Sequence, residues 1–427
     1  MSHIPTRLAS SPVDPGGGGA SVRPPGRVHR YADPMPSFDP FPALRYAPGA
    51  DLQAVIAPPY DVVSDADVDA LAARDPHNIV HVDVPRGGAD RYQLAADLLN
   101  RWVDAGVLVA DDEPSLTIYR MAFTDATGAD RTIVGVLGGL EVVDAGAGGV
   151  LPHERTTPKA STDRLDLTRA THTNLSPVWG LSLASGLTQE LAEPGEPVGS
   201  MTADGVVHTV ERVTDPTRIA RIRAILAADD VLIADGHHRY AISRVYRDEV
   251  RAATGRDDTA AERTLTFVNE LIPEQLSIEA IHRLYTGIGT DELLAALTRC
   301  FDLAPAPAPT PATLAEMVES GRLVLLAPDG SASWLTPKPG AFDGVRALDG
   351  AWLEHALAGT SAVPSYQHGL DEMLAAVASG EFAAGVLIRP TSLAEIQRTA
   401  REGLLMPPKS TFFTPKLRTG FVIRPTA

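Results

Sequence analysis

Residues 231–240 limit the possible folds of this chain more than any other stretch. The first four are apolar and partly β-branched, which predicts a short buried strand. Asp235 and Gly236 then give a turn signal. Beyond the turn, apolar residues recur at helical spacing, at Ile242, Val245, Tyr246 and Val250. The pattern predicts a strand, a tight glycine turn and a helix in direct succession.

This predicted junction has the features of an anion-binding site. A helix N-terminus presents N–H groups without intrahelical partners and the positive end of the helix dipole. The alternative is an ordinary turn at Asp235-Gly236, a core histidine at His238 and a solvated Arg239. We favour a ligand site because a carboxylate, two imidazoles and a guanidinium stand in five consecutive positions, 235–239. In α/β proteins such strand-to-helix junctions hold ligands.

The charge balance argues against a nucleic-acid or membrane partner. The chain has 37 Lys and Arg against 54 Asp and Glu, a formal net charge of −17, which opposes non-specific binding to nucleic acid or anionic lipid. No apolar run approaches the ~20 residues of a membrane span, and residues 1–48 contain no apolar signal segment. The single cysteine, Cys300, excludes a disulfide framework or a thiolate zinc site within one chain. We expect a cytoplasmic protein whose partners are small molecules, and homodimerisation stays open.

The segment pattern predicts an α/β or α+β fold with mixed sheets. Residues 1–48, rich in Pro, Gly, Ser and Arg, are predicted to form a disordered tail. Residues 49–304 are predicted to form the main domain, and residues 305–427 a smaller C-terminal α/β domain that packs back on the site. The boundary is set at the Ala-Pro run 305–311, a semi-rigid connector. Within the main domain we expect a strand over 78–84 and a Pro/Gly linker over 189–200.

Residues 151–164 form a second chemically dense stretch, with a histidine, two acids, three cations and four hydroxyls. A solvated loop is the alternative. We favour a functional loop because prolines restrain it and because it leads through Asn174 and Ser176 into an apolar strand; loops held by a scaffold are where function concentrates. Glu154 is the candidate base, with Arg155 or Lys159 as charge partners.

The closing run 403–416 resembles a P-loop only in part. Lys409 and Ser410 fit that pattern, but Pro408 stands at the second glycine position. Pro407 and Pro408 lack the N–H groups of a phosphate cradle, so the run is not a Walker motif. A basic, hydroxyl-bearing wall around an anion site and a structural tail both stay open.

Four motifs together resemble one known family. Pro-Pro-Tyr-Asp-Val stands at 58–62, His-Glu-Arg-Thr at 153–156, Asp-Gly-His-His-Arg-Tyr at 235–240 and Met-Pro-Pro-Lys-Ser-Thr at 406–411. These motifs mark a bacterial and archaeal family of unknown function, and the resemblance covers nearly everything after the N-terminal tail. On this resemblance the chain is identified as a member of that family.

The Asp-Gly-His-His-Arg element also resembles the ParB/sulfiredoxin-like superfamily, in which the corresponding loop and helix bind nucleotide phosphates. Its relatives include kinases that phosphorylate free L-serine from a nucleotide or inorganic pyrophosphate. The resemblance therefore implies a ParB/sulfiredoxin-like core and a Mg²⁺-dependent phosphotransferase that converts serine to O-phosphoserine.

Carried over to this sequence, the resemblance implies that Asp235 is a Mg²⁺ ligand and that Asp235, His238 and Glu154 are catalytic, with Glu154 accepting the serine hydroxyl proton. A bound phosphate would favour the charged forms of the imidazoles, whose ordinary pKa is ~6.5. The residues expected to contact the donor are His153, Arg155, Thr156, Lys159, Asn174, Ser176, Gly236, His237, Arg239, Lys409 and Ser410.

The sequence leaves the donor and two other function classes open. No adenine pocket is recognisable, so pyrophosphate, ADP and ATP all stay open as donors. A ParB-like nucleotide-binding switch without a small-molecule acceptor would carry a helix-turn-helix and a basic face, which this sequence does not offer. A phosphatase or nucleotide hydrolase, in which water replaces the acceptor, is the other alternative.

Overall fold

The fold is built around a large mixed sheet. The computed structural model describes residues 36–125, 128–152, 161–406 and 409–426, and residues 34–427 form one compact unit. Strands of the large sheet follow the order β6 (Val150–Leu151), β11 (Val231–Asp235), β8 (Val178–Ser182), β12 (Arg263–Glu270), β5 (Asp130–Glu141), β4 (Leu116–Thr124), β10 (Val206–Val213) and β9 (Glu196–Ala203), and β1 (Phe38–Asp39) also pairs with β5. The β11–β6 and β12–β8 pairs are parallel and the others antiparallel. The predicted α/β or α+β class with mixed sheets is confirmed.

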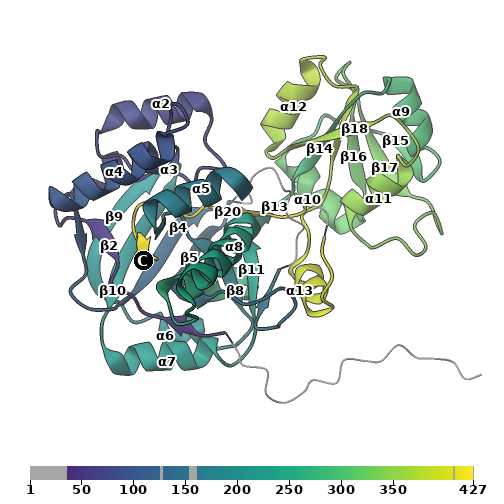
Figure 1. Cartoon of the computed structure of the whole chain (residues 1–427). Helices are drawn as coiled ribbons and strands as arrows, with labels where there is room; N and C mark the ends of the chain where they lie inside the picture. The colour runs from purple at the N-terminus through teal and green to yellow at the C-terminus, as the bar shows by residue number, and fades with distance from the viewer. Residues whose placement is uncertain (1–35, 126–127, 153–160, 407–408, 427) are drawn as a thin grey trace, which may run out of the picture. The chain divides into compact units, whose positions relative to one another are not determined.

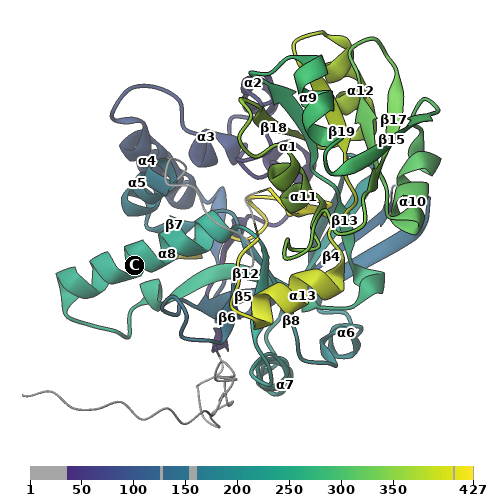
Figure 2. The ribbon, with the colours of Figure 1, turned by 90° about the vertical axis from the view of Figure 1, so that its right-hand side faces the viewer.

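Helices α5 (Ser161–Thr171) and α8 (His237–Thr254) lie side by side (Figure 1, Figure 2). The expected strand and helix on either side of Gly236 are confirmed as β11 and α8. Helix α8 ends at Gly255, whose left-handed φ of 69° suits a residue without a side chain. The other helices of this part are α1 (Leu52–Val55), α2 (Asp65–Arg74), α3 (Val80–Asp83), α4 (Arg91–Asp104), α6 (Leu187–Glu190) and α7 (Pro216–Leu226).

A second sheet is entirely antiparallel. Its strands follow the order β15 (Phe301–Ala306), β17 (Ala332–Pro337), β16 (Leu323–Leu326), β19 (Ala384–Leu387), β14 (His282–Thr286) and β18 (Val363–Gln367). The helices of this part are α9 (Thr290–Leu297), α10 (Pro311–Ser320), α11 (Asp349–Ala356) and α12 (Leu370–Ala378). This sheet takes strands from both sides of residue 305, where we placed the domain boundary, and the domain division stays a prediction.

The residues after α13 (Leu393–Arg401) return to the large sheet as a chain segment that we call the C-terminal segment, residues 409–426 (yellow in Figure 1). Its strand β20 (Phe412–Thr414) pairs with β13 (Ser277–Glu279), and β21 (Arg424–Pro425) pairs with β7 (Thr173–Asn174). Single bridges join Thr419 to Ala57 and Ile423 to Leu44, which begins β2 (Leu44–Tyr46), the partner of β3 (Leu108–Ala110). The segment is therefore part of the core structure around the site.

Two expectations for local structure are wrong. Residues 78–84 contain the short helix α3 and form no strand. Asn78 Oδ1 accepts from Val80 N at 3.0 Å and Asn78 Nδ2 donates to Ala54 O at 2.6 Å, and these contacts hold the chain in a helical turn. The expected linker over 189–200 contains the end of α6 and the beginning of β9, whose pairing with β10 satisfies the extended backbone. In the described ranges, no helix is long and apolar enough to span a membrane.

Candidate functional site

Gly236 sets the angle between β11 and α8. Its φ of 83° lies in the left-handed region, which residues other than glycine adopt only with strain. A Cβ at this position would lie 3.1 Å from Cζ and Nε of Arg239 and 3.3 Å from the Cα of Val178. Glycine therefore lets the Arg239 side chain fold back against the turn.

Four charged side chains of alternating sign form a row beside the beginning of α8, which we call the charge row: Asp61, Arg239, Asp235 and Lys416. Arg239 Nη2 donates to Asp235 Oδ2 at 2.6 Å and lies 3.5 Å from Asp61 Oδ2. Lys416 Nζ donates to the other Asp235 oxygen, Oδ1, at 2.9 Å. The Arg239 and Lys416 side chains are only 9% and 15% exposed, so these contacts are screened less than surface ion pairs.

The charge row fixes the ionisation of Asp235 and Arg239. Burial raises the pKa of Asp235, but the charges of Lys416 and Arg239 more than offset this and hold it far below its usual value. Burial lowers the pKa of Arg239, whereas Asp61 and Asp235 raise it to a net value above the ordinary one. Asp235 is thus a permanent anion at working pH, which suits an electrostatic role and not proton exchange.

Lys416 reaches Asp235 because both flanks of the C-terminal segment are anchored. On one side Phe413 is buried against Trp179, and on the other Arg418 pairs with Asp204. Sequence reasoning did not include Lys416 among the site residues. In the sequence Lys416 is marked only by its position after a proline in the basic closing run. That position does not reveal that the run returns to β11.

The two histidines lie in the first turn of α8 and are partly buried. Burial, Lys409 and Arg239 lower the pKa of His238, against the opposing charge of Asp61. The imidazole of His238 is therefore mainly neutral at pH 7 and can accept a proton. His237 contributes to the low pKa of Asp235. Lys409, from the closing run, therefore lies near the Asp-Gly-His-His-Arg motif, and its role as a wall of the site stays a prediction.

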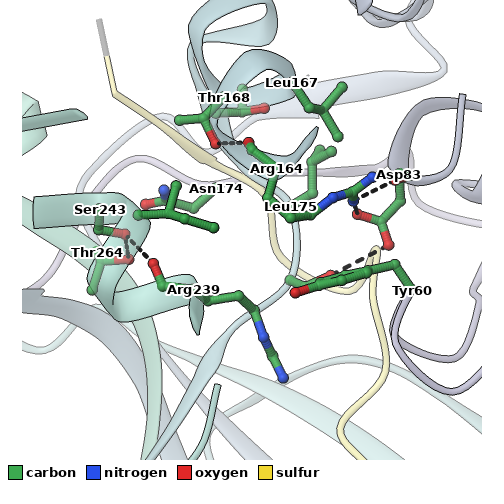
Figure 3. Close-up of a pocket in the computed structure, with 13 residues that line it drawn as sticks. Tyr60, Asp83, Arg164, Leu167, Thr168, Asn174, Leu175, Arg239, Ser243 and Thr264 are labelled. Atoms are coloured by element: carbon green, nitrogen blue, oxygen red, sulfur yellow. Dashed lines mark hydrogen bonds and ion pairs between the residues drawn. The ribbon is translucent and has the colours of Figure 1, made fainter. Parts of the chain in front are cut away.

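A cavity of ≈50 Å³ lies beside Arg239 (Figure 3). We call it the Asp83 cavity; its polar lining includes Tyr60, Asp83, Arg164, Asn174, Ser176 and Arg239. The sequence-predicted residues Asn174 and Ser176 thus lie together with Arg239. Their side chains already have protein partners, because Asn174 Oδ1 accepts from Leu265 N at 3.0 Å and Ser176 Oγ lies 2.7 Å from Thr419 Oγ1.

Asp83 and Arg164 form a buried pair in this cavity. Arg164 Nη1 donates to the Asp83 carbonyl oxygen at 2.5 Å and lies 3.2 Å from Asp83 Oδ1. Burial raises the pKa of Asp83, although Arg164 and Arg239 act in the opposite direction. We did not identify Asp83 as a site residue from the sequence. Its only distinguishing feature there is that it is a single acidic residue in a valine-rich run.

The Pro-Pro-Tyr-Asp-Val motif contributes to both features. Its Asp61 belongs to the charge row, and the guanidinium of Arg164 lies 4.3 Å from the ring centroid of Tyr60. Burial, as the largest effect, raises the pKa of Tyr60 to about 12, so the hydroxyl stays protonated. The motif is therefore positioned between the charge row and the Asp83 cavity.

The central part of the second predicted stretch, residues 153–160, lies outside the described residues. His153, Glu154, Arg155, Thr156 and Lys159 belong to it, and their placement opposite Asp235 stays a prediction. Ser410 is described, and its carbonyl oxygen accepts from Thr391 Oγ1 at 2.9 Å. Within the described ranges no three His, Cys, Asp or Glu side chains gather as a metal site.

Comparison with known proteins identifies the family. The sequence matches the family described as "Protein of unknown function (DUF1015)" over residues 38–351. The chain belongs to this family. The family membership predicted from the four motifs is confirmed, and the match ends before the last of them at 406–411. No curated protein matches this DUF1015 chain.

Solved structures resemble this DUF1015 protein only weakly. A free serine kinase in complex with AMP is 13% identical with a TM-score of 0.35, over 62% of this chain and 83% of that one. A conserved hypothetical protein from Pyrococcus furiosus is 13% identical with a TM-score of 0.35, over 64% of this chain and 91% of that one. SbnI with a C-terminal truncation, from Staphylococcus aureus, is 13% identical with a TM-score of 0.36, over 67% of this chain and 87% of that one. Likeness of this degree carries no weight for function.

Proposed function

We propose that this DUF1015 protein is a phosphotransferase that moves a phosphoryl group from pyrophosphate, ADP or ATP to the hydroxyl of a small metabolite, with free L-serine as the first candidate acceptor. The observation that carries the proposal is the charge row at the N-terminus of α8. Two largely buried cations, Arg239 and Lys416, are held there near the first turn of α8 and its two imidazoles. This is a fixed arrangement for a polyanion.

The chemistry of phosphoryl transfer suits this arrangement. The reaction depends on in-line positioning and on neutralisation of charge, more than on covalent participation of the protein. Donors that are already oriented need no reorganisation when charge develops on the transferring group. In this proposal Arg239, Lys416 and the first turn of α8 bind the donor phosphates, with His237, His238 and Lys409 beside them. Glu154 accepts the acceptor's hydroxyl proton.

Mg²⁺ fits the proposal as an ion shared between the donor and the protein. Mg²⁺ is commonly held by one or two carboxylates together with substrate phosphate oxygens and water, so a complete protein cage is not needed. Asp235 and Asp61, on either side of Arg239, are the carboxylates that would hold the ion. When bound, the ion would neutralise charge on the transferring group.

The test is a phosphorus NMR screen of the purified protein with pyrophosphate, ADP and ATP against serine and other hydroxyl amino acids. We expect O-phosphoserine to form with at least one donor. Asp235→Asn should lower the rate by ~100-fold or more, because it unbalances the charges around the donor. Asp97→Asn, an exposed acid on α4, is the matched control and should leave the rate unchanged.

Other outcomes would assign another function class. Phosphate release that does not depend on the acceptor would indicate a hydrolase. Tight nucleotide binding without turnover would indicate a switch. No transfer from any of the three donors to any hydroxyl amino acid would refute the proposal.

A further inference from the structure

The lining of the Asp83 cavity includes a hydrogen-bond donor that the protein does not use. Arg239 donates Nη1 to the Pro177 carbonyl oxygen and Nη2 to Asp235 Oδ2, but within the described ranges its Nε has no partner. The Arg239 side chain is 9% exposed, so bulk water does not satisfy this donor. Since burying an N–H group of a cation without a partner is unfavourable, Arg239 favours a ligand that brings an acceptor oxygen.

Tyr60 supplies a second donor to the cavity. Burial raises its pKa to about 12, while the nearby charge of Arg239 acts in the opposite direction. The hydroxyl therefore stays protonated and can donate to a ligand oxygen. The guanidinium of Arg164 lies 4.3 Å from the centroid of the Tyr60 ring and restrains that ring. Tyr60 and Arg239 thus offer two hydrogen-bond donors, one of them charged, to a group in the cavity.

The charges that line the cavity favour an anion. Among the described residues, two guanidiniums and one carboxyl group line it, those of Arg164, Arg239 and Asp83. Asp83 already has a partner, because Arg164 Nη1 lies 3.2 Å from its Oδ1. Burial raises the pKa of Asp83 and so favours its neutral form, and an anion beside it favours that form further. Asp61 and Asp235 approach Arg239 at Nη2, which leaves Nε for the ligand.

The size of the cavity selects a small anionic group. One water molecule needs about 10–15 Å³ of such volume, whereas the cavity has ≈50 Å³, which suits a carboxylate group. A nucleotide base needs a pocket of roughly 300 Å³ or more, so the donor nucleotide is excluded from this cavity. Because Arg239 lines the cavity and also binds Asp235 of the charge row, a carboxylate held here lies next to the candidate transfer site.

We infer that the Asp83 cavity binds the carboxylate group of a small organic acid through Arg239 Nε and the Tyr60 hydroxyl, and that this acid is the acceptor of the transfer. The second half of the inference rests on the proposed function. The carboxylate supplies the acceptor oxygens that the two donors lack and offsets the charge of Arg239. Recognition therefore depends on the carboxylate of the acceptor and not on an amine. Hydroxy acids and hydroxyl amino acids both qualify, and amino alcohols do not.

The experiment is isothermal titration calorimetry of the full-length protein with L-serine, glycerate and ethanolamine. Serine and glycerate share the carboxylate, whereas ethanolamine keeps the amine and the hydroxyl of serine and lacks the carboxylate. We expect serine and glycerate to bind with similar affinity and ethanolamine at least ~10-fold more weakly, the effect of losing one charged hydrogen bond. Ethanolamine binding as tight as that of glycerate, or no binding of any of the three, would overturn the inference.

Two substitutions test the assignment within the cavity. Tyr60→Phe removes one donor, keeps the ring beside Arg164 and should weaken glycerate binding ~10-fold. Tyr366→Phe, at an exposed position of β18, is the matched control and should bind as the wild type does. Asp83→Asn should bind glycerate at least as tightly as the wild type, because it removes an acid and can still accept from Arg164. Unchanged binding by Tyr60→Phe, or a ~10-fold loss for Asp83→Asn, would overturn the inference.

The inference and the proposed function fail in different ways. If the variants do not fold, the three-ligand comparison on the wild-type protein decides alone. Glycerate binding without phosphoryl transfer from any donor would keep the cavity assignment and refute the proposed function. Equal transfer to serine and ethanolamine would keep the phosphotransferase and overturn the cavity assignment.

Discussion

At the scale of single residues, Gly236 controls the junction between β11 and α8. Gly236→Ala introduces two unfavourable effects, a left-handed φ for alanine and a Cβ 3.1 Å from the Arg239 guanidinium. We expect the free energy of unfolding to fall by ~2–3 kcal/mol and any transfer activity to fall with it, since Arg239 must move. Urea unfolding measures the first effect.

Gly359→Ala is the matched control for this substitution. Gly359 has a φ of 80°, but nothing lies within 4 Å of the position that an added Cβ would take, so only the backbone strain applies. It should cost ~1 kcal/mol. Equal losses for the two variants would show that Arg239 does not crowd position 236.

Lys416 is the second residue on which the site depends. Lys416→Met removes one of the two cations that hold Asp235 ionised, so the pKa of Asp235 should rise. Loss of one member of a buried pair costs roughly 3 kcal/mol. The wild-type contribution of Asp235 is present above its unfolded pKa and is lost as pH falls through its depressed folded pKa. The variant should therefore lose stability at higher pH than the wild type during acid titration followed by circular dichroism.

The exposed Lys338, which lies 3.7 Å from Asp302, gives the comparison for Lys416. Lys338→Met should change the free energy of unfolding by less than ~1 kcal/mol, as is usual for surface pairs. A Lys416→Met protein as stable as this control at every pH would contradict the assigned role of Lys416.

At the scale of elements, the C-terminal segment is attached to β10 and β4 through a neutral histidine. Arg418 Nε donates to His208 Nε2 at 3.4 Å, and His208 Nδ1 lies 2.8 Å from the Tyr119 hydroxyl. Burial and the charge of Arg418 lower the pKa of His208 to about 3, against the opposing charge of Asp204. In the unfolded chain His208 takes up a proton near pH ~6.5. In the folded protein it stays neutral at this pH, so the free energy of unfolding falls as the pH drops below ~6.5.

This linkage gives a quantitative prediction for His208→Gln. Between pH 7.5 and 5.5 the wild-type protein should lose ~1.4 kcal/mol more unfolding free energy than the variant, because one proton is bound only by the unfolded state. Urea unfolding at the two pH values measures the difference. Parallel pH dependences of the two proteins would show that His208 is protonated in the folded state or does not contribute.

The elements differ in how well the sequence predicts them. β11 and α8 follow from local signals, because a buried β-branched run, a glycine turn and helical spacing all agree there. α3 does not, since its alternating Val80, Val82 and Val84 favour a strand while Asn78 and contacts with residues 54 and 55 select a helical turn. Tertiary contacts override β propensity in so short a segment.

The candidate site divides in the same way. Residues of a continuous motif, such as Asp235 and Arg239, were found because their spacing carries the signal. Asp61, Asp83 and Lys416 join them through contacts that span 100 residues or more, and a single sequence holds no record of such contacts. The sequence therefore indicated one part of the candidate site, and it did not indicate the residues that contact that part from elsewhere in the chain.

At the scale of the whole molecule, the C-terminal segment stabilises the part of the chain that contains the large sheet. It contributes five buried apolar residues to the same cluster as residues of that sheet, namely Phe413, Leu417, Phe421, Val422 and Ile423. Each buried side chain of this size contributes roughly 1.5–3 kcal/mol, and a domain has only about 5–15 kcal/mol of net stability. A chain that ends at residue 411 should therefore lose cooperative unfolding, as followed by differential scanning calorimetry. A truncated chain with an unchanged melting transition would contradict this.

The second sheet should behave differently, because its core is made from its own residues. The two apolar clusters on its faces, which include Phe301 and Leu335 on one and Val324 and Met373 on the other, take their buried members only from residues 280–388. By contrast, Ile396 and Ala400 of α13 belong to the cluster of the large sheet. A fragment of residues 280–390 keeps all six strands and the Asp349–Arg389 pair, at 2.5 Å.

We therefore expect the 280–390 fragment to fold alone, with a dispersed ¹H–¹⁵N spectrum and a cooperative thermal transition. A fragment of ~110 residues buries enough surface for an independent core. The matched fragment 305–427, cut at the predicted boundary, lacks β14 at the position between β19 and β18 and should stay unfolded. Folding of the second fragment but not the first would place the boundary at residue 305 after all, because the sheet would then be stable without its β14 strand.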